Sequence, residues 1–167
     1  NNIFMRPVIV GCLLTFILLS CKSGNKTPDV SGIKINLSTD RFERDLFSLD
    51  TNHITEQLDQ LIAKYPSFGE NFLVKILNVD PLWSADTCAN YVKGFIGSYH
   101  NVYDSAENIF TDFSPYEKEI KIGLQYVHYY FPDYKLPTKL ITYIGPIDGF
   151  GDIITEDALV VGLHQHL

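Results

Sequence analysis

The sequence predicts an α+β fold that is mostly helical and contains a small sheet. Apolar residues recur at helical spacing through the middle of the chain, residues 33–37 alternate apolar and polar side chains, and the runs 140–144 and 153–154 are strand-like. A strand, several helices, a strand pair and a last helix form the order expected of α+β proteins. Hydrophobic content of 46% and charged content of 20% are ordinary for a globular domain.

The first elements follow from residue spacing. The alternation over residues 33–37 predicts a half-buried strand, and residues 41–47 are expected to form a charged and aromatic connector. Residues 54–65 place their apolar side chains on one face of a helix, which Pro66 ends. A second helix is expected over residues 68–77.

Two further helices are predicted in the middle of the chain. Residues 89–99 present a third apolar face. The clearest helix start follows, because Ser114 can cap a helix, Pro115 suits its first position and Glu117 completes a capping box. This fourth helix is expected to run to Pro132.

The C-terminal part is predicted to hold a strand, a turn and a last helix. Residues 140–144 are strand-like, and the glycine-rich stretch 145–152 favours a tight hairpin. Asp157 is expected to cap an apolar helix that reaches Leu167. Because the sequence stops within this periodic stretch, we expect residues 33–167 to be the N-terminal part of a domain truncated at its C-terminus.

The beginning of the chain predicts a lipoprotein signal peptide over residues 1–20. Arg6 supplies a charged first region, the apolar run from Pro7 to Leu19 follows, and the small residue Ser20 stands directly before Cys21. The run of about 13 residues is shorter than the roughly 20 that a membrane-spanning helix needs. Cleavage before the cysteine is therefore expected.

Cys21 is the predicted lipidation site. We expect diacylation of its thiol and acylation of its new amino group, with chains such as palmitate. Two or more acyl chains anchor a protein stably in a membrane, whereas a single chain binds only marginally. Residues 21–32 are polar and lack apolar periodicity, so they are predicted to be a lipidated tether. The alternative is a plain secretory signal with a coincidental cysteine. Only Cys88 remains in the domain, so no intramolecular disulfide is expected.

No catalytic residue, metal site or cofactor is predicted. His164 and His166 are two residues apart, which places them on nearly opposite faces of the predicted helix. The His-Glu-x-x-His motif of a metallopeptidase does not occur, and the glycines of residues 145–151 match neither a phosphate loop nor a dinucleotide site. A calcium site that uses Asp148 and Asp152 is the alternative to a simple turn there.

One candidate partner surface stands out near the end of the fourth helix, at Tyr126, Tyr129, Tyr130 and Tyr134. Most of the aromatic side chains in this region are expected in the core, but tyrosine can bury its ring while its hydroxyl meets a polar partner, which suits an interface. The 13 Lys and Arg face 20 Asp and Glu and form no basic run, so a nucleic-acid partner is not expected.

Five spaced blocks resemble one known family. The stretches Ile35–Leu37, Arg41–Phe47 and Lys64–Phe68, followed by Tyr143–Gly145 and Asp157–Leu163, are similar to the gliding motility lipoprotein GldB family of Bacteroidetes. The resemblance spans about residues 33–167, and none of its blocks is catalytic. It implies a non-catalytic cell-envelope lipoprotein associated with gliding motility and the type IX secretion apparatus, with envelope proteins of that machinery as partners.

The resemblance also implies a layout distantly like that of zincin-type metallopeptidases. No metal ligand can be carried over, because the His-Glu-x-x-His motif is missing. Two alternatives stay open at this point. One is a membrane-tethered hydrolase whose catalytic motif lies beyond Leu167, and the other is a lipoprotein that binds a small molecule or peptide in a groove.

The residues after the lipidation site predict the location. Lys22 follows Cys21, so the Asp that marks inner-membrane retention in many bacteria is absent. Residues 23–27 lack the acidic run that resembles a surface-export signal in Bacteroidetes lipoproteins. The domain is therefore expected to face the periplasm from the outer membrane.

Overall fold

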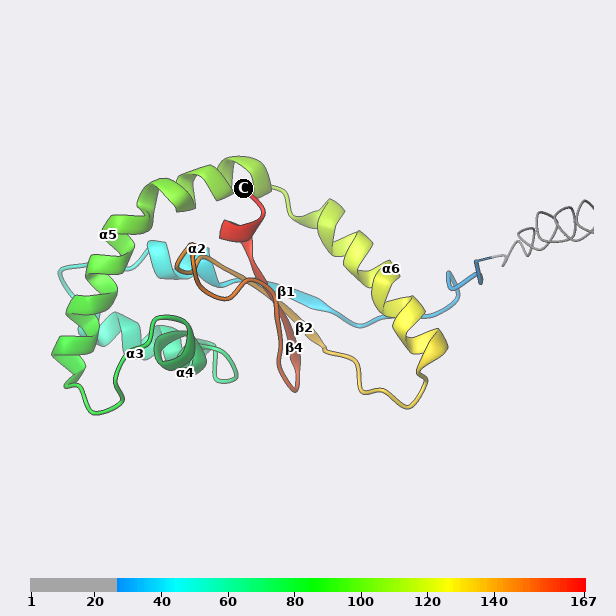
Figure 1. The fold of residues 1–167 in the computed structure, drawn as a ribbon, viewed down its shortest axis with the longest axis horizontal. Helices are drawn as coiled ribbons and strands as arrows, with labels where there is room; N and C mark the ends of the chain where they lie inside the picture. Colours follow the sequence, from blue (N-terminus) through cyan, green and yellow to red (C-terminus); the bar gives the residue numbers. More distant parts are fainter. Residues whose placement is uncertain (1–26) are drawn as a thin grey trace, which may run out of the picture.

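The computed structural model describes residues 27–167 and confirms the predicted α+β class (Figure 1). The predicted signal peptide and Cys21 lie outside the described residues. In chain order the elements are β1 (Ser38–Arg41), α2 (Phe42–Phe47), α3 (Ile54–Lys64), α4 (Gly69–Asn71), the π-helix η1 (Phe72–Ile76), α5 (Ala85–Phe110), α6 (Ser114–Tyr130), β2 (Lys139–Tyr143), β3 (Ile153–Ile154), β4 (Ala158–Gly162) and the 3₁₀-helix η2 (Leu163–Gln165).

The sheet has four strands in the order β1-β2-β4-β3. The first three are parallel, and Thr39, Leu140 and Leu159 stand in one row across them. The short edge strand β3 is antiparallel to β4, with Ile154 opposite Leu159. Parallel neighbours need a long crossover, and all the helices from α2 to α6 lie in the connection between β1 and β2. Within residues 27–167, no helix is both long and apolar enough to cross a membrane.

An aromatic cluster joins the sheet to the helices on its left in Figure 1. Phe42, the first residue of α2, is buried and packs against the rings of Tyr65, Phe68 and Phe72 at centroid distances of 5.0, 4.9 and 4.8 Å. Tyr143 from β2 approaches Phe68 from the sheet side at 5.5 Å. Edge-on and tilted pairs of this kind stabilise a core beyond the area they bury.

The first predicted strand is wrong in position. Residues 33–37 lie before β1, which begins at Ser38 opposite Lys139. Ile33 is held instead by α6, because the Gln125 side chain donates a hydrogen bond of 2.7 Å to its carbonyl oxygen. The alternation of apolar and polar residues over 33–37 therefore reflects packing of one side of the segment, where Leu37 is buried, and not pairing with another strand. The expected connector over residues 41–47 is mostly the helix α2.

The predicted helices in the first half are confirmed. The helix expected over residues 54–65 is α3, and the helix expected over 68–77 is α4 followed by η1. The third expected helix, over 89–99, is the middle of the longer α5, whose first turn is capped by the Ser84 hydroxyl. Apolar spacing marked the middle of α5 but missed its C-terminal end, where Ala106 and Phe110 are buried.

The capping box predicted at the start of α6 does not form. Ser114 is the first helical residue, and Asp112 accepts hydrogen bonds from its backbone N–H at 3.0 Å and its hydroxyl at 2.6 Å. Glu117 points instead toward the sheet and accepts from Thr39 at 2.6 Å and Lys121 at 2.5 Å, and these bonds lower the pKa of the Glu117 carboxyl.

The last predicted helix is wrong, because residues 158–162 form the strand β4. Ala158, Val160 and Gly162 are buried while the residues between them are half-buried, a period of two. A short apolar run fits a strand and a helix equally well, and pairing with β2 decides the outcome. The stretch 145–152 is likewise no hairpin between paired strands, because β2 pairs with β4 and not with β3.

Candidate functional site

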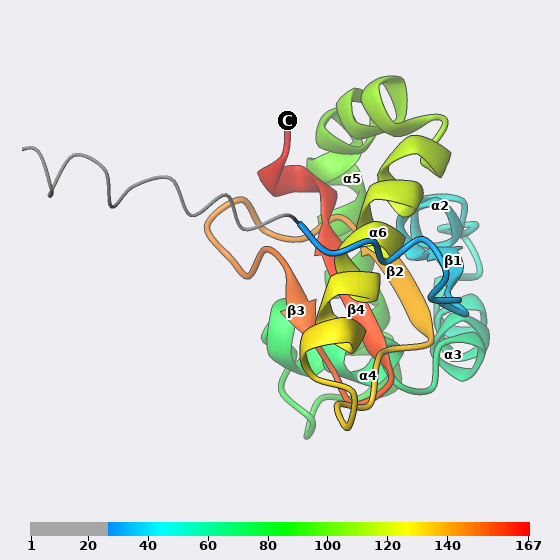
Figure 2. The same ribbon diagram turned by 90° about the vertical axis from the view of Figure 1, so that its right-hand side faces the viewer.

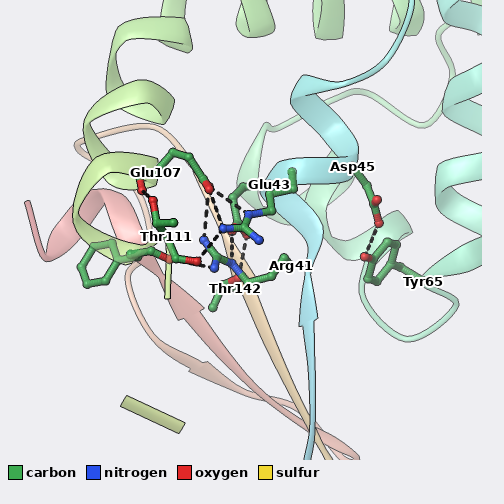
Figure 3. Close-up of polar contacts among 9 residues, drawn as sticks. Arg41, Glu43, Asp45, Tyr65, Glu107, Thr111 and Thr142 are labelled. Atoms are coloured by element: carbon green, nitrogen blue, oxygen red, sulfur yellow. Dashed lines mark hydrogen bonds and ion pairs between the residues drawn. The ribbon is translucent and has the colours of Figure 1, made fainter. Parts of the chain in front are cut away.

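A buried charged network joins β1, α2, α5 and β2 (Figure 3). The Glu43 side chain is only 1% exposed. Its carboxylate accepts a 2.7 Å hydrogen bond from the Thr142 hydroxyl and pairs with the Arg41 guanidinium. Arg41 also donates from Nη1 to the backbone oxygen of Phe110 at 2.8 Å. A charge this deeply buried is stable only when it is paired and hydrogen-bonded, and both conditions are met.

A second pair extends the network to solvent. Arg44 of α2 donates to both carboxylate oxygens of Glu107 on α5, at 2.9 and 2.5 Å, and to the backbone oxygen of Thr111 at 2.8 Å. Two parallel bonds of this kind are among the strongest that proteins make, and they raise the pKa of Arg44. The two arginines thus donate hydrogen bonds to the carbonyl oxygens of Phe110 and Thr111, which have no partner within the helix because they lie at its C-terminal end.

A separate contact in Figure 3 ties α2 to α3. Asp45 accepts hydrogen bonds from the Tyr65 hydroxyl and from Lys64 Nζ, both at 2.5 Å. Burial raises the pKa of Tyr65 well above its ordinary value. These contacts fasten α2 to the end of α3.

His164, one of the two histidines that the sequence singled out, lies inside the fold. Its Nδ1 accepts the Gly145 N–H at 3.0 Å, so Nε2 carries the proton and donates it to the Phe150 carbonyl oxygen at 3.1 Å. Burial lowers the pKa of His164. The Tyr143 hydroxyl also binds the carbonyls of Phe150 and Gly151, at 2.6 and 2.8 Å, and burial raises its pKa to about 12. The two rings clamp the 145–152 loop onto the sheet.

His166 sits in a different environment. Its Nε2 is 3.2 Å from Asp152 Oδ1, an oxygen that also accepts the backbone N–H of Gly162 at 3.2 Å. The structure does not bring His166 and His164 to a shared metal-binding position. Among residues 27–167 no group of three or more His, Cys, Asp or Glu side chains is placed to hold a metal ion. The Cys88 thiol is half-buried, and burial raises its pKa.

An apolar groove of about 390 Å³ lies between the α5–α6 corner and β4. Its walls are mainly aliphatic and aromatic, and its polar lining residues include Tyr116, Glu119, Asp152 and His166. Its lining contains no serine, cysteine or lysine that could serve as a nucleophile. The size and lining of the groove suit an apolar side chain.

The predicted tyrosine surface is largely exposed. The exposed fractions are 51% for Tyr129, 58% for Tyr130 and 49% for Tyr134, while Tyr126 is half-buried. Phe131, which the predicted set left out, is the most exposed of the group at 64%. The expectation that most of these rings belong to the core is therefore wrong. We call Tyr129, Tyr130, Phe131 and Tyr134 the aromatic end of α6.

The aromatic end of α6 owes its exposure to the way the helix stops. The Phe131 N–H still bonds to the Val127 carbonyl at 2.8 Å, Pro132 follows, and a turn closes from Tyr134 N–H to the Phe131 carbonyl at 3.0 Å. The helix end and turn line an open hollow of about 680 Å³. The rings of Tyr129 and Tyr130 meet almost perpendicularly at 5.0 Å, and no element of residues 27–167 covers them. Sequence periodicity could not show this, because α6 contains no fully buried residue.

These features define an α+β domain whose buried charges are paired internally and whose exposed rings gather at one helix end. A family model described as gliding motility protein GldB matches residues 23–167, so the chain belongs to that family. The resemblance inferred from the sequence blocks is confirmed, and the protein is a gliding-motility lipoprotein. No curated protein and no solved structure matches the chain. The zincin-like layout stays a prediction.

We expect Glu43→Gln to lower the free energy of unfolding by about 3–5 kcal/mol, because it removes the nearer charge partner of the largely buried Arg41 and leaves only the longer 3.5 Å contact with Glu107. The comparison variant is Glu107→Gln, which also belongs to the network but whose side chain is 30% exposed, so solvent screening should keep its loss to about 1–2 kcal/mol, smaller than that of Glu43→Gln. Urea unfolding followed by circular dichroism measures both. Equal losses in the two variants would contradict the central place of Glu43.

We also expect the protein to lose stability in mild acid through His164. Its pKa is lowered in the fold, so below about pH 6.5 the unfolded chain takes up a proton that the folded chain resists, and stability falls as the pH falls. His164→Gln, which keeps a donor and an acceptor, should flatten the dependence of the melting temperature on pH between about 5 and 7.5.

The control for that measurement is His53→Gln. His53 is exposed, and its hydrogen bond to Asp50 raises its pKa, so its contribution has the opposite sign and is lost as the pH rises. An acid dependence in His164→Gln as steep as in the wild type would show that another group is responsible.

Proposed function

We propose that this protein is a non-catalytic lipoprotein of the cell envelope, anchored through acyl chains on Cys21, that supports gliding motility and the type IX secretion apparatus by surface contacts. Family membership and the sequence pattern Leu18–Cys21 support the anchored role. The proposal adds the anchor residue, the secretion link and the absence of catalysis.

One observation carries the non-catalytic part. Among the described residues, the fully buried polar or charged side chains are Glu43, Thr142 and His164. Each is hydrogen-bonded to another segment of the fold. A catalytic site instead keeps a perturbed polar group open to a cleft. The buried polar side chains of this domain are therefore best explained as groups that hold its segments together.

The exposed rings support a role in contacts. Tyrosine combines a large apolar ring with a hydroxyl, and it is enriched where one side of a residue is apolar and the other is wet. Tyr129, Tyr130 and Tyr134 have that character at the aromatic end of α6. An adaptor that meets other envelope components needs such a surface.

The residues that follow Cys21 also support a location for the protein. Lys22 after Cys21 and the lack of an acidic run in residues 23–27 support an outer-membrane protein that faces the periplasm. Protease added to intact cells should then leave the domain undigested, whereas protease added after permeabilisation should degrade it.

The test of the anchor is Cys21→Ser in cells. The variant should lose its acyl mass, leave the membrane fraction and reduce colony spreading. Cys88→Ser is the matched control, because it removes a thiol from the domain without touching the anchor, and it should remain membrane-bound. Wild-type membrane retention of Cys21→Ser would refute lipid anchoring at this residue. Normal spreading by the released variant would show that anchoring is not required for function.

A further inference from the structure

We propose that the aromatic end of α6 docks on the surface of the lipid bilayer to which the protein is anchored. This inference rests on the proposed anchor at Cys21 and names the lipid surface as what these rings meet. Phe131 and Tyr130 are 64% and 58% exposed, so they leave large apolar areas in water. That exposure is unfavourable unless another surface covers the rings.

The chemistry of the rings suits the bilayer interface. Tyr129, Tyr130 and Tyr134 form no side-chain hydrogen bond within residues 27–167, which leaves their hydroxyls free for headgroups and water. Phe131 is wholly apolar and stands among them. Tyrosine is enriched at membrane–water interfaces because its ring prefers the acyl boundary and its hydroxyl prefers the headgroup layer.

The tether enters the domain at this end of the molecule. The first described residues, in blue, lie on the same side of the molecule as α6 in Figure 1 and cross in front of the middle of that helix in Figure 2. The hydrogen bond between Gln125 and the Ile33 carbonyl fixes this placement. Lys34, His128 and Tyr134 also share the wall of one hollow of about 290 Å³.

The length of the tether limits how far this end can stand from the membrane. Six residue steps separate Cys21 from Thr27, which reach at most roughly 20 Å when fully extended. An acyl anchor therefore keeps the aromatic end of α6 close to the headgroups. Among the other exposed apolar side chains, Ile147 and Phe150 belong to the 145–152 loop, which lies far along the molecule from the start of the described chain in Figure 1.

Charge at this end is compatible with a lipid surface. The chain as a whole carries a net charge of −7, which opposes simple adsorption to anionic lipid. The exposed Lys34 brings positive charge to the end that holds the rings, with Asp29 and Asp133 offsetting part of it, and the sequence before the described residues adds Lys22 and Lys26. This distribution of charge is consistent with docking through the aromatic rings, with nearby lysines attracted to the lipid headgroups.

The experiment uses the complete lipidated protein in vesicles of phosphatidylethanolamine and phosphatidylglycerol, with some phosphatidylcholine brominated near the headgroup end of one acyl chain. Trp83, the single tryptophan, is first removed by Trp83→Phe. Phe131→Trp then places a fluorophore on the aromatic end of α6. Phe150→Trp is the matched control, since Phe150 is also exposed, at 60%, but lies on the distant loop.

Bromine quenches tryptophan only on close contact, so we expect Phe131→Trp to be quenched at least about two-fold more strongly than Phe150→Trp. Circular dichroism melting confirms that both variants are folded. Equal, weak quenching in vesicles that carry the protein on flotation overturns the docking and leaves the anchor intact, and it points to a protein partner for the rings. Failure of the protein to float refutes the anchor, and the docking falls with it.

Discussion

The buried carboxylate of Glu43 is the constraint on which the arrangement of this domain depends. A charge in the interior is costly unless partners compensate it, and Glu43 obtains its partners from different parts of the chain. Arg41 comes from the end of β1, and Thr142 comes from β2. The pairing therefore holds only when β1, α2 and β2 are correctly assembled, which makes it a check on the whole fold and not a local feature.

Arg41 and its neighbour Arg44 extend this network to the C-terminal end of α5. Arg41 holds the Phe110 carbonyl and Arg44 holds the Thr111 carbonyl, so the end of α5 is fixed where the chain turns into α6. Because α6 has no fully buried residue, polar contacts such as Thr39–Glu117 and Gln125–Ile33 orient it on the sheet side. A weakly buried helix held at defined points can present its last turn to an outside surface.

The elements that could be predicted from sequence are those set by local rules. Apolar spacing and a proline defined α3, and strand-like residues defined β2. The failures involve long-range partners. The burial of Glu43 was not predicted, because its partner Thr142 is 99 positions away in the sequence. β4 looked helical because only pairing with β2 distinguishes a short apolar run as a strand. The clustering of tyrosines near the end of α6 could be predicted from the sequence. Their exposure could not, because it depends on which other segments pack against that end.

The proposed anchor and the proposed docking together imply a domain on a short tether with the aromatic end of α6 turned toward the bilayer. The most direct test is photo-crosslinking in living cells, with a benzoylphenylalanine in place of Tyr130 and, as the control, in place of Phe150. The account predicts that irradiation at position 130 yields adducts with the small added mass of a phospholipid, and that position 150 yields none. A discrete adduct with the mass of a second protein at position 130, without lipid adducts, would contradict it.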